Sequence, residues 1–332
     1  MRKRNKQDLL ILFFKSVLMG TANKLPGISG GLVALITGFY HEMVITFKSL
    51  NIKTIKALLR GNFKKIEKEY NGLFLVIVLL GIIVSYFTTS KILDFFFKIS
   101  ELNVWSFFFG MIIASLFILI NQNKVNNKKD IIYLCIGFSI GFILSISDPI
   151  SENQNLLFVF FCGMISICGM IIPGISGSFL LILLGNYKLL LVDSVDALIE
   201  SVWIIINMDN FNDIDFNLIR ILIVFSLGSV FGLILLSNIL SWLINNYENT
   251  VNQLIIGFVS GSLLMIWPWK KSYIEEFNNL EISNNYLRYL PDLSQTKDII
   301  ALACVISGLV IVLYVEKYVS RKKNIWTYRK KN

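Results

Sequence analysis

The stretch KLPGISGGLVALITGFY (Lys24–Tyr40) interrupts an apolar run with Pro-Gly-Ile-Ser-Gly, and it returns as IIPGISGSFLLILLGNY (Ile171–Tyr187). Proline lacks a backbone donor and glycine is conformationally free, so each break ends one helical piece, and the serine or glycine that follows begins the next. In a bilayer, non-helical backbone persists only where protein buries it or where it faces a water-filled cavity. Two such breaks therefore indicate a functional centre in a helical protein.

The composition is that of a membrane protein with many spans. The chain has 332 residues, of which 55% are hydrophobic and 16% charged, and its mean hydropathy is +0.66. These values are typical of polytopic membrane proteins rather than soluble domains. The net charge of +9 is expected from cytoplasmic loops and contact with anionic lipid. Because no soluble basic segment interleaved with aromatic residues occurs, we expect no nucleic acid partner.

Apolar segments recur along the whole chain. A hydrocarbon core of ~30 Å needs ~20 helical residues to cross it. Six segments lie outside the motif regions and approach that length, and four more form two pairs, each split by a break. The first 22 residues also have the order of a signal peptide, but Lys15 interrupts the apolar part and cleavage after Ala22 would cut beside the first motif. The segments are 8–22, 29–47, 73–90, 104–120, 131–147, 156–172, 175–192, 218–244, 251–268 and 299–316.

The repeat extends beyond the two motifs. A constant offset of 147 residues pairs Pro26 with Pro173 and Tyr40 with Tyr187. The same offset also pairs four later residues, Gly81, Gly110, Ser115 and Leu116, with Gly228, Gly257, Ser262 and Leu263. One register kept over this distance predicts a duplicated unit of one broken hairpin and three spans.

The repeat predicts an all-α polytopic membrane protein built from two inverted repeats, 1–147 and 148–332, in one integral membrane domain. Each repeat holds a helix hairpin broken at PGISG and three transmembrane helices. Three crossings separate the hairpins, and three is odd, so the second repeat enters from the opposite face. Hairpins that re-enter and hairpins that span the membrane both give this inversion, so the two forms stay open.

The positions of Lys and Arg predict that both termini are cytoplasmic. In this orientation the cytoplasmic segments hold 21 of the 31 Lys and Arg residues, whereas the outer loops hold 7. Cytoplasmic loops of membrane proteins carry such an excess. The predicted outer loop 193–217 holds six acids and neither Lys nor Arg. We therefore expect a multi-pass plasma-membrane protein whose cytoplasmic segments are 1–7, 48–71, 121–130, 245–250 and 317–332.

The breaks predict an anion site. A helix that begins at a break presents free N–H groups and the positive end of its dipole, and small residues allow a ligand to approach the backbone closely. Two inverted copies would bring two such ends to a shared centre. Lys15 or Arg220 would offset the charge of the anion, and Tyr40 and Tyr187 would donate hydrogen bonds to it. The backbone and hydroxyl candidates are Gly27, Ser29, Gly30, Gly31, Gly174, Ser176, Gly177 and Ser178.

Each of these residues also has a purely structural interpretation. Gly27 and Gly31 are four residues apart, and such pairs of small residues often serve close helix packing. Lys15 would then extend to the cytoplasmic interface and Arg220 would anchor a span at the outer one. The two tyrosines would be interface residues. Both sets of alternatives remain open at the level of sequence.

Metal and cofactor chemistry is not indicated. His41 is the single histidine, so a metal centre has too few ligands. The four cysteines lie in apolar runs without a CxxC spacing and are expected to pack as small hydrophobic residues. We expect no cofactor, no metal and no catalytic residue.

Three segments resemble the signatures of a known family. MGTANKLPGISGGLVALITGFY, GMIIPGISGSFLLILLGNY and GFVSGSLLMIWPW are similar to the conserved segments of the PopT-type undecaprenyl-phosphate translocases. The resemblance covers nearly the whole chain. It implies a protein that returns the C55 lipid carrier undecaprenyl phosphate from the outer to the inner leaflet for reuse in peptidoglycan and other envelope polymers. The phosphate headgroup would sit between the PGISG tips while the polyprenyl tail stays in the membrane lipid.

The resemblance has one departure, and three other functions compete with it. Family members carry an Asp shortly before the first motif, where this chain reads Ala22-Asn23-Lys24, so coupling to an ion is not implied here and the coupling ion is unknown. The first rival is a channel or transporter for a small inorganic anion. The others are an integral-membrane enzyme acting on a lipid phosphate, which the lack of clustered intramembrane acids argues against, and a structural membrane scaffold.

Overall fold

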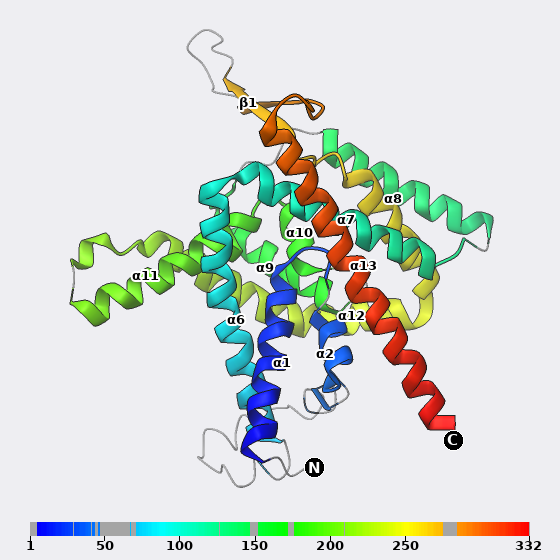
Figure 1. Cartoon of the computed structure of the whole chain (residues 1–332), viewed down its shortest axis with the longest axis horizontal. Helices are drawn as coiled ribbons and strands as arrows, with labels where there is room; N and C mark the ends of the chain where they lie inside the picture. Colours follow the sequence, from blue (N-terminus) through cyan, green and yellow to red (C-terminus); the bar gives the residue numbers. More distant parts are fainter. Residues whose placement is uncertain are drawn as a thin grey trace. The chain divides into compact units, whose positions relative to one another are not determined.

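The chain is described by a computed structural model for residues 5–28, 30–40, 42–43, 46, 67, 71–125, 127–146, 152–171, 176–208, 210–274 and 284–331. Figure 1 shows a helical protein with one short β-hairpin. The elements are α1 (Lys6–Lys24), α2 (Gly30–Thr37), α6 (Gly72–Ile99), α7 (Glu101–Gln122), α8 (Lys128–Ile146), α9 (Leu156–Ile171), α10 (Gly177–Leu183), the π-helix η1 (Leu189–Asp193), α11 (Ser194–Asn207), the 3-10 helix η2 (Phe211–Asp213), α12 (Phe216–Ser262), β1 (Lys270–Ile274), β2 (Asn284–Arg288) and α13 (Thr296–Lys331).

Several helices have the length and composition of membrane spans. Within the described residues, three helical stretches are long and apolar enough to cross a membrane: Gly72–Ile99, Glu101–Gln122 and Thr296–Tyr318. Two shorter apolar stretches, Leu156–Ile167 and Phe216–Gly232, accompany them. The predicted helical membrane protein is confirmed at this level.

The helices that follow the two breaks are shorter than the apolar runs predicted. Gly38, with φ +84°, ends α2, and Gly185, with φ +73°, follows α10. After each helix the backbone N–H of the residue that follows this glycine reaches back five residues: Phe39 donates to the Ala34 carbonyl and Asn186 donates to that of Leu181, both over 3.1 Å. These are Schellman-type endings, in which glycine adopts the left-handed conformation without strain. Glycine therefore interrupts the single helices predicted for 29–47 and 175–192.

Three other sequence predictions need correction. The outer loop predicted at 193–217 contains α11 and η2. The cytoplasmic loop predicted at 245–250 is helical and is marked only by a kink at Tyr247 (φ −137°, ψ 33°), which divides α12 into an N-terminal and a C-terminal part. The antiparallel hairpin of β1 and β2 was not predicted, because its short polar strands lack an apolar alternation.

The chain forms two compact units. The first comprises residues 1–24 and 29–89, and the second comprises 25–28 and 90–332. In the first unit α1 and α2 lie side by side (Figure 1). Its core joins residues of α1 and the start of α6 to Ala34 of α2, and it includes Leu12, Met19, Ala34, Phe39, Met43, Phe74 and Val78. These units differ from the two predicted repeats, whose boundary at 147/148 stays a prediction.

Close glycine contacts hold α1 against α6 in the first unit. A Cβ atom on Gly81 would lie 2.8 Å from the Phe13 carbonyl oxygen. In the second unit α9 and the N-terminal part of α12 meet in the same way, because a Cβ atom on Gly228 would overlap the Phe160 carbonyl oxygen. Both members of the second pair lie 147 residues after those of the first. Each unit therefore contains the same helix crossing in the same register.

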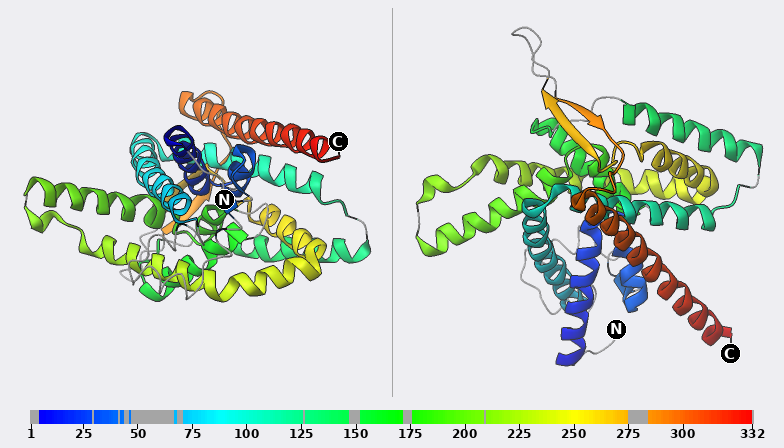
Figure 2. Two further views of the ribbon diagram at one scale, coloured as in Figure 1. Left: turned by 90° about the horizontal axis from the view of Figure 1, so that it is seen from below. Right: turned by 45° about the horizontal axis from the view of Figure 1, so that its top comes forward.

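Two further helix pairs complete the second unit, α7 with α13 and α8 with the C-terminal part of α12. Figure 2 shows α8 beside the yellow, C-terminal part of α12. Glycines again allow the backbones to touch: Gly110 faces the Val305 carbonyl, and Gly257 faces that of Leu134. Gly110 and Gly257 are themselves 147 residues apart. Gly110 thus contacts α13, and Gly257, which matches it in the 147-residue register, contacts α8.

Candidate functional site

The first break lies between α1 and α2 and is bonded to α7. Residues 25–28 are not helical, and Gly27 has φ +87°, which disfavours any side chain there. A Cβ atom at Gly27 would lie 2.8 Å from both the Met111 carbonyl oxygen and the Ser115 Oγ. The Ser115 hydroxyl donates to the Gly27 carbonyl and also contacts the Met111 carbonyl at 3.0 Å. Gly27 is therefore required both by its φ and by the close approach of α7.

The second motif meets the first. Ser176 precedes α10 in extended conformation (φ −99°, ψ 135°), and its side chain does not cap the helix. Instead its Oγ lies 3.4 Å from the Leu25 carbonyl oxygen and 2.5 Å from the Oγ of Ser178. Ser176 and Ser178 are both buried. One hydroxyl of the second motif thus reaches the carbonyl of Leu25, the residue directly before the first motif.

A small cavity lies where the motifs meet. Its volume is about 20 Å³, which is space for one water molecule. The polar part of its lining consists of the Gly27 backbone and the hydroxyls of Ser115 and Ser176. Its remaining walls are apolar. The lining is Gly27, Ile112, Ser115, Leu116, Leu119, Ser176, Phe179 and Val259.

The glycine of the second motif has a packing role. A Cβ atom on Gly177 would overlap the carbonyl oxygen of Ser166 in α9, so this glycine allows α10 to lie against α9. The small-residue packing interpretation therefore applies at Gly177, whatever else this residue does. Ser29 and Gly174, which were also predicted to line the site, lie outside the described residues.

Two side chains of α1 fix α2 at its two ends. The Asn23 Oδ1 accepts a hydrogen bond from the Gly30 backbone N–H at 3.1 Å, and a Cβ atom on Gly30 would overlap the Asn23 amide. The Lys15 ammonium group donates to the Thr37 carbonyl at 2.6 Å, in the last turn of α2. Gly31 is half-buried on the same helix. A cation at a helix C-terminus is favourable, so Lys15 has a structural partner.

Lys24 is a buried cation that the sequence analysis did not select. It is the last residue of α1, beside the break, and it is 0% exposed. Its Nζ donates to the Tyr86 carbonyl at 2.7 Å and lies 4.2 Å from the centre of the Tyr86 ring. Its position in the sequence could have identified it. Burying a charged lysine in an apolar run costs free energy, so a lysine directly before a break is expected to have a function.

The two predicted tyrosines and Arg220 differ in burial and in the residues that they contact. Tyr187 is 1% exposed and packs edge-on against Trp105 and Phe108, whereas Tyr40 is 38% exposed. Arg220 is exposed near the start of α12, where it donates to the Asn217 side chain at 3.2 Å. Neither Tyr187 nor Arg220 lines the cavity at Gly27 and Ser176. Tyr40 and Lys15 belong to the other compact unit.

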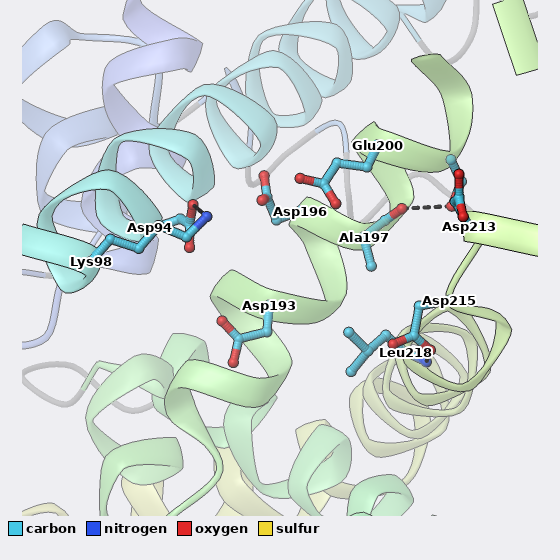
Figure 3. Close-up of a pocket in the computed structure, with 10 residues that line it drawn as sticks. Asp94, Lys98, Asp193, Asp196, Ala197, Glu200, Asp213, Asp215 and Leu218 are labelled. Carbon is cyan, nitrogen blue, oxygen red and sulfur yellow. Dashed lines mark hydrogen bonds and ion pairs between the residues drawn. The ribbon is translucent and has the colours of Figure 1, made fainter. Parts of the chain in front are cut away.

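A larger cavity of about 210 Å³ is lined by acids of α6, η1, α11 and the segment before α12 (Figure 3). Lys98 pairs with Asp94 at 2.7 Å, and Lys91 pairs with Asp196 at 2.5 Å. Burial raises the pKa of Asp193 to about 6, although nearby Lys188 opposes the shift. Within the described residues, no group of three or more His, Cys, Asp or Glu side chains has the arrangement of a metal site. The acidic residues are Asp94, Asp193, Asp196, Glu200, Asp213 and Asp215.

Comparisons with family models and with known proteins indicate the same family. The family described as undecaprenyl phosphate translocase-like matches residues 19–282. A polyprenyl-phosphate transporter of Vibrio cholerae serotype O1 is 29% identical over 322 residues, which cover 95% of this chain and 98% of that protein. A polyprenyl-phosphate transporter of Staphylococcus aureus is 25% identical over 270 residues, or 78% of this chain and 86% of that protein. No solved structure matches the chain.

Proposed function

We propose, from the fact that this chain belongs to the undecaprenyl phosphate translocase-like family, that it transports a polyprenyl phosphate lipid across the bacterial plasma membrane. The substrate is undecaprenyl phosphate, and the direction is from the outer to the inner leaflet, so that the carrier is reused in cell-wall synthesis. The observation that carries this proposal is the meeting of the two breaks, where Ser176 of the second motif reaches the carbonyl of Leu25, the residue directly before the first motif.

The headgroup site is formed by these paired breaks. The hydration shell of the phosphate would be replaced by the hydroxyls of Ser115, Ser176 and Ser178 and by the backbone around Gly27. A cavity of about 20 Å³ holds a single water, so the headgroup requires the motifs to separate. The apolar walls contributed by Ile112 and Phe179 keep the site otherwise dry. Transport then consists of opening this cavity alternately toward each leaflet while the lipid tail remains in the bilayer.

Helix directions support an inverted repeat. Asn123, just after α7, accepts hydrogen bonds from Asn252 (2.7 Å) and Gln253 (3.2 Å), near the start of the C-terminal part of α12. The end of α7 therefore meets the start of its counterpart 147 residues later, as expected if the two run in opposite directions. Repeats related in this way favour alternating access around a central site. We place both termini in the cytoplasm, as the Lys and Arg distribution predicts.

Reconstitution in liposomes tests the proposal. Labelled undecaprenyl phosphate is added to one leaflet, and its appearance in the other is followed with and without the protein. We expect protein-dependent transfer that is lost when Gly27 is changed to leucine. Release of trapped inorganic phosphate without lipid transfer would instead favour the small-anion transporter. Absence of lipid transfer by the folded wild-type protein would contradict the proposed function.

A further inference from the structure

A cluster of amide side chains joins the end of α7 to the start of the C-terminal part of α12. The Asn252 side chain donates to the Asn123 Oδ1 at 2.7 Å, and the Gln253 side chain donates to the Asn123 carbonyl at 3.2 Å. One turn earlier in α12, Asn249 donates to Asp130, at the start of α8, over 2.8 Å. The end of α7, the start of α8 and the kink of α12 therefore lie together (Figure 2). This is the predicted cytoplasmic end of these helices.

The cluster closes one end of the interface that holds the central cavity. In this interface α7 contributes Ser115 and Leu119 to the cavity lining, and α12 contributes Val259. The Leu119 carbonyl accepts hydrogen bonds from both the backbone N–H (3.0 Å) and the side-chain amide (2.9 Å) of Asn123, one turn further along α7. A headgroup that leaves the cavity between α7 and α12 toward the predicted cytoplasmic side therefore meets the amide cluster.

The cluster connects two helix pairs that are each packed through glycines. A Cβ atom on Gly110 of α7 or on Gly308 of α13 would overlap a backbone carbonyl of the other helix, and the same holds for Gly137 of α8 and Gly257 of α12. Such backbone contacts make each pair a stiff unit, because carbonyls cannot rotate away. Neutral amides at helix ends, in contrast, exchange their partners for water at little cost. Movement of one pair against the other therefore breaks amide hydrogen bonds and keeps both pairs intact.

One oxygen of the cluster lacks a donor while the amides are joined. Gln253 is 0% exposed, and its Oε1 has no hydrogen-bond partner among the described residues. A buried acceptor in this condition destabilises the closed arrangement, and water that enters on opening satisfies it. Ser106 of α7 matches Gln253 in the 147-residue register, and it is likewise 0% exposed with a hydroxyl that has no partner in the described part of the chain. Polar groups buried at this cost within apolar helices indicate a function.

We propose that Asn123, Asn252 and Gln253 form an inner gate that closes the cytoplasmic end of the headgroup path. In the closed gate both amide donors of α12 are used on Asn123. Opening separates α7 and α13 from α8 and the C-terminal part of α12, and it frees these donors for the phosphate oxygens of the passing headgroup. The kink at Tyr247 lies just before the gate, so the C-terminal part of α12 moves without its N-terminal part. The identity of the passing group rests on the proposed function.

Reversible crosslinking tests the gate in liposomes. In a protein whose native cysteines are replaced, Asn123→Cys/Asn252→Cys is joined by a short thiol-specific crosslinker that dithiothreitol cleaves. We expect the crosslink to slow transfer of labelled undecaprenyl phosphate at least tenfold and dithiothreitol to restore it. Gln122→Cys/Glu316→Cys is the matched control, because these side chains bond α7 to α13 at 3.0 Å, within one stiff pair, and its crosslink should change transfer less than twofold. Equal effects of the two crosslinks, or none from the first, would overturn the gate.

A second measurement reports the gate without lipid transfer. In inverted membrane vesicles, which expose the cytoplasmic face, a membrane-impermeant maleimide labels a cysteine placed in the cavity by Ser115→Cys. Adding Asn123→Ala/Asn252→Ala should speed this labelling at least fivefold, whereas adding Gln122→Ala should change it less than twofold. Labelling that stays equally slow would contradict the gate. If the gate variants speed labelling but the wild-type protein moves no polyprenyl phosphate, the gate stands and the proposed function falls. If crosslinked protein still transfers the lipid, the function stands and the gate falls.

Discussion

At the residue scale, Ser115 links α7 to the break, because its single O–H lies within hydrogen-bond distance of two backbone carbonyls. It joins Gly27, in the break, to Met111, one turn earlier in α7. In the sequence Ser115 stands out only as a repeat match with Ser262, since nothing in the local pattern shows that α7 passes the first break. Conversely, Arg220 was selected for its charge, but it lies exposed with Asn217 as its partner. A residue such as Ser115, whose role depends on a contact with a segment distant in the sequence, could therefore not be identified from the sequence.

Ser115→Ala should reduce transport without unfolding the protein. The change removes one hydrogen bond, worth about 0.5–1.5 kcal/mol, so we expect transport to fall by no more than about tenfold. Ser307→Ala is the matched control, because Ser307 also bonds a carbonyl of its own helix but is exposed on α13. Transport in liposomes and the melting temperature are measured for both. Equal transport in the two variants would argue against a role for Ser115 at the break.

Asp193→Asn should stabilise the protein at neutral pH. The pKa of Asp193 is raised from 3.8 to about 6 by burial, and Glu152, Asp94 and Asp196 add to the shift against the opposing Lys188. The folded state thus holds the proton at higher pH than the unfolded state, and its stability falls as pH rises from about 4 to about 6. Asparagine does not ionise and avoids this loss.

The measurement for Asp193→Asn is the melting temperature at several pH values. The difference between variant and wild type should be small near pH 4 and should grow in favour of the variant up to pH 7. Asp213→Asn removes an exposed carboxylate of the same cavity and serves as the control. A difference that does not change with pH would contradict the assignment.

At the scale of elements, helix crossings reproduce the repeat more closely than helix lengths do. Gly81 contacts Phe13 and Gly228 contacts Phe160 in the same register, although the apolar runs that hold these residues differ in length. The sequence predicted most helices because membrane spans are long apolar runs. It did not predict the kink at Tyr247 or the β-hairpin, since a kinked helix reads as two spans and a loop, and polar strands carry no periodic signal.

Gly81→Val and Gly228→Val should lower the melting temperature to a similar extent. Each valine would press against a backbone carbonyl, which cannot rotate away, and overpacking of this kind typically costs about 1–3 kcal/mol. Ser226→Val adds the same side chain to an exposed position of α12 and should have little effect. The purified variants are compared by thermal unfolding in detergent. Melting temperatures like that of the control would show that the two crossings are not tightly packed.

At the scale of the whole molecule, the predicted repeat states which helices should be equivalent, whereas the orientation in the membrane depends on the loops. The contact between the end of α7 and the start of the C-terminal part of α12, at Asn123, supports the proposed inversion. The direction of the protein in the membrane rests on the positions of Lys and Arg alone. Proteins with inverted repeats are nearly symmetric in their helices, so only the charges of the connecting segments distinguish the two faces.

Cysteine labelling tests this orientation. Asn127 and Asn212 are both exposed, and they lie in segments predicted to be cytoplasmic and external, respectively. The native cysteines, Cys135, Cys162, Cys168 and Cys304, are first replaced, because Cys135 is itself exposed. A membrane-impermeant maleimide should then label Asn212→Cys in intact cells and Asn127→Cys only after permeabilisation. Labelling of both from one side would contradict the inverted arrangement, because the path between them would cross the membrane an even number of times. The reverse pattern would keep the inversion but would place the hairpin of β1 and β2 in the cytoplasm.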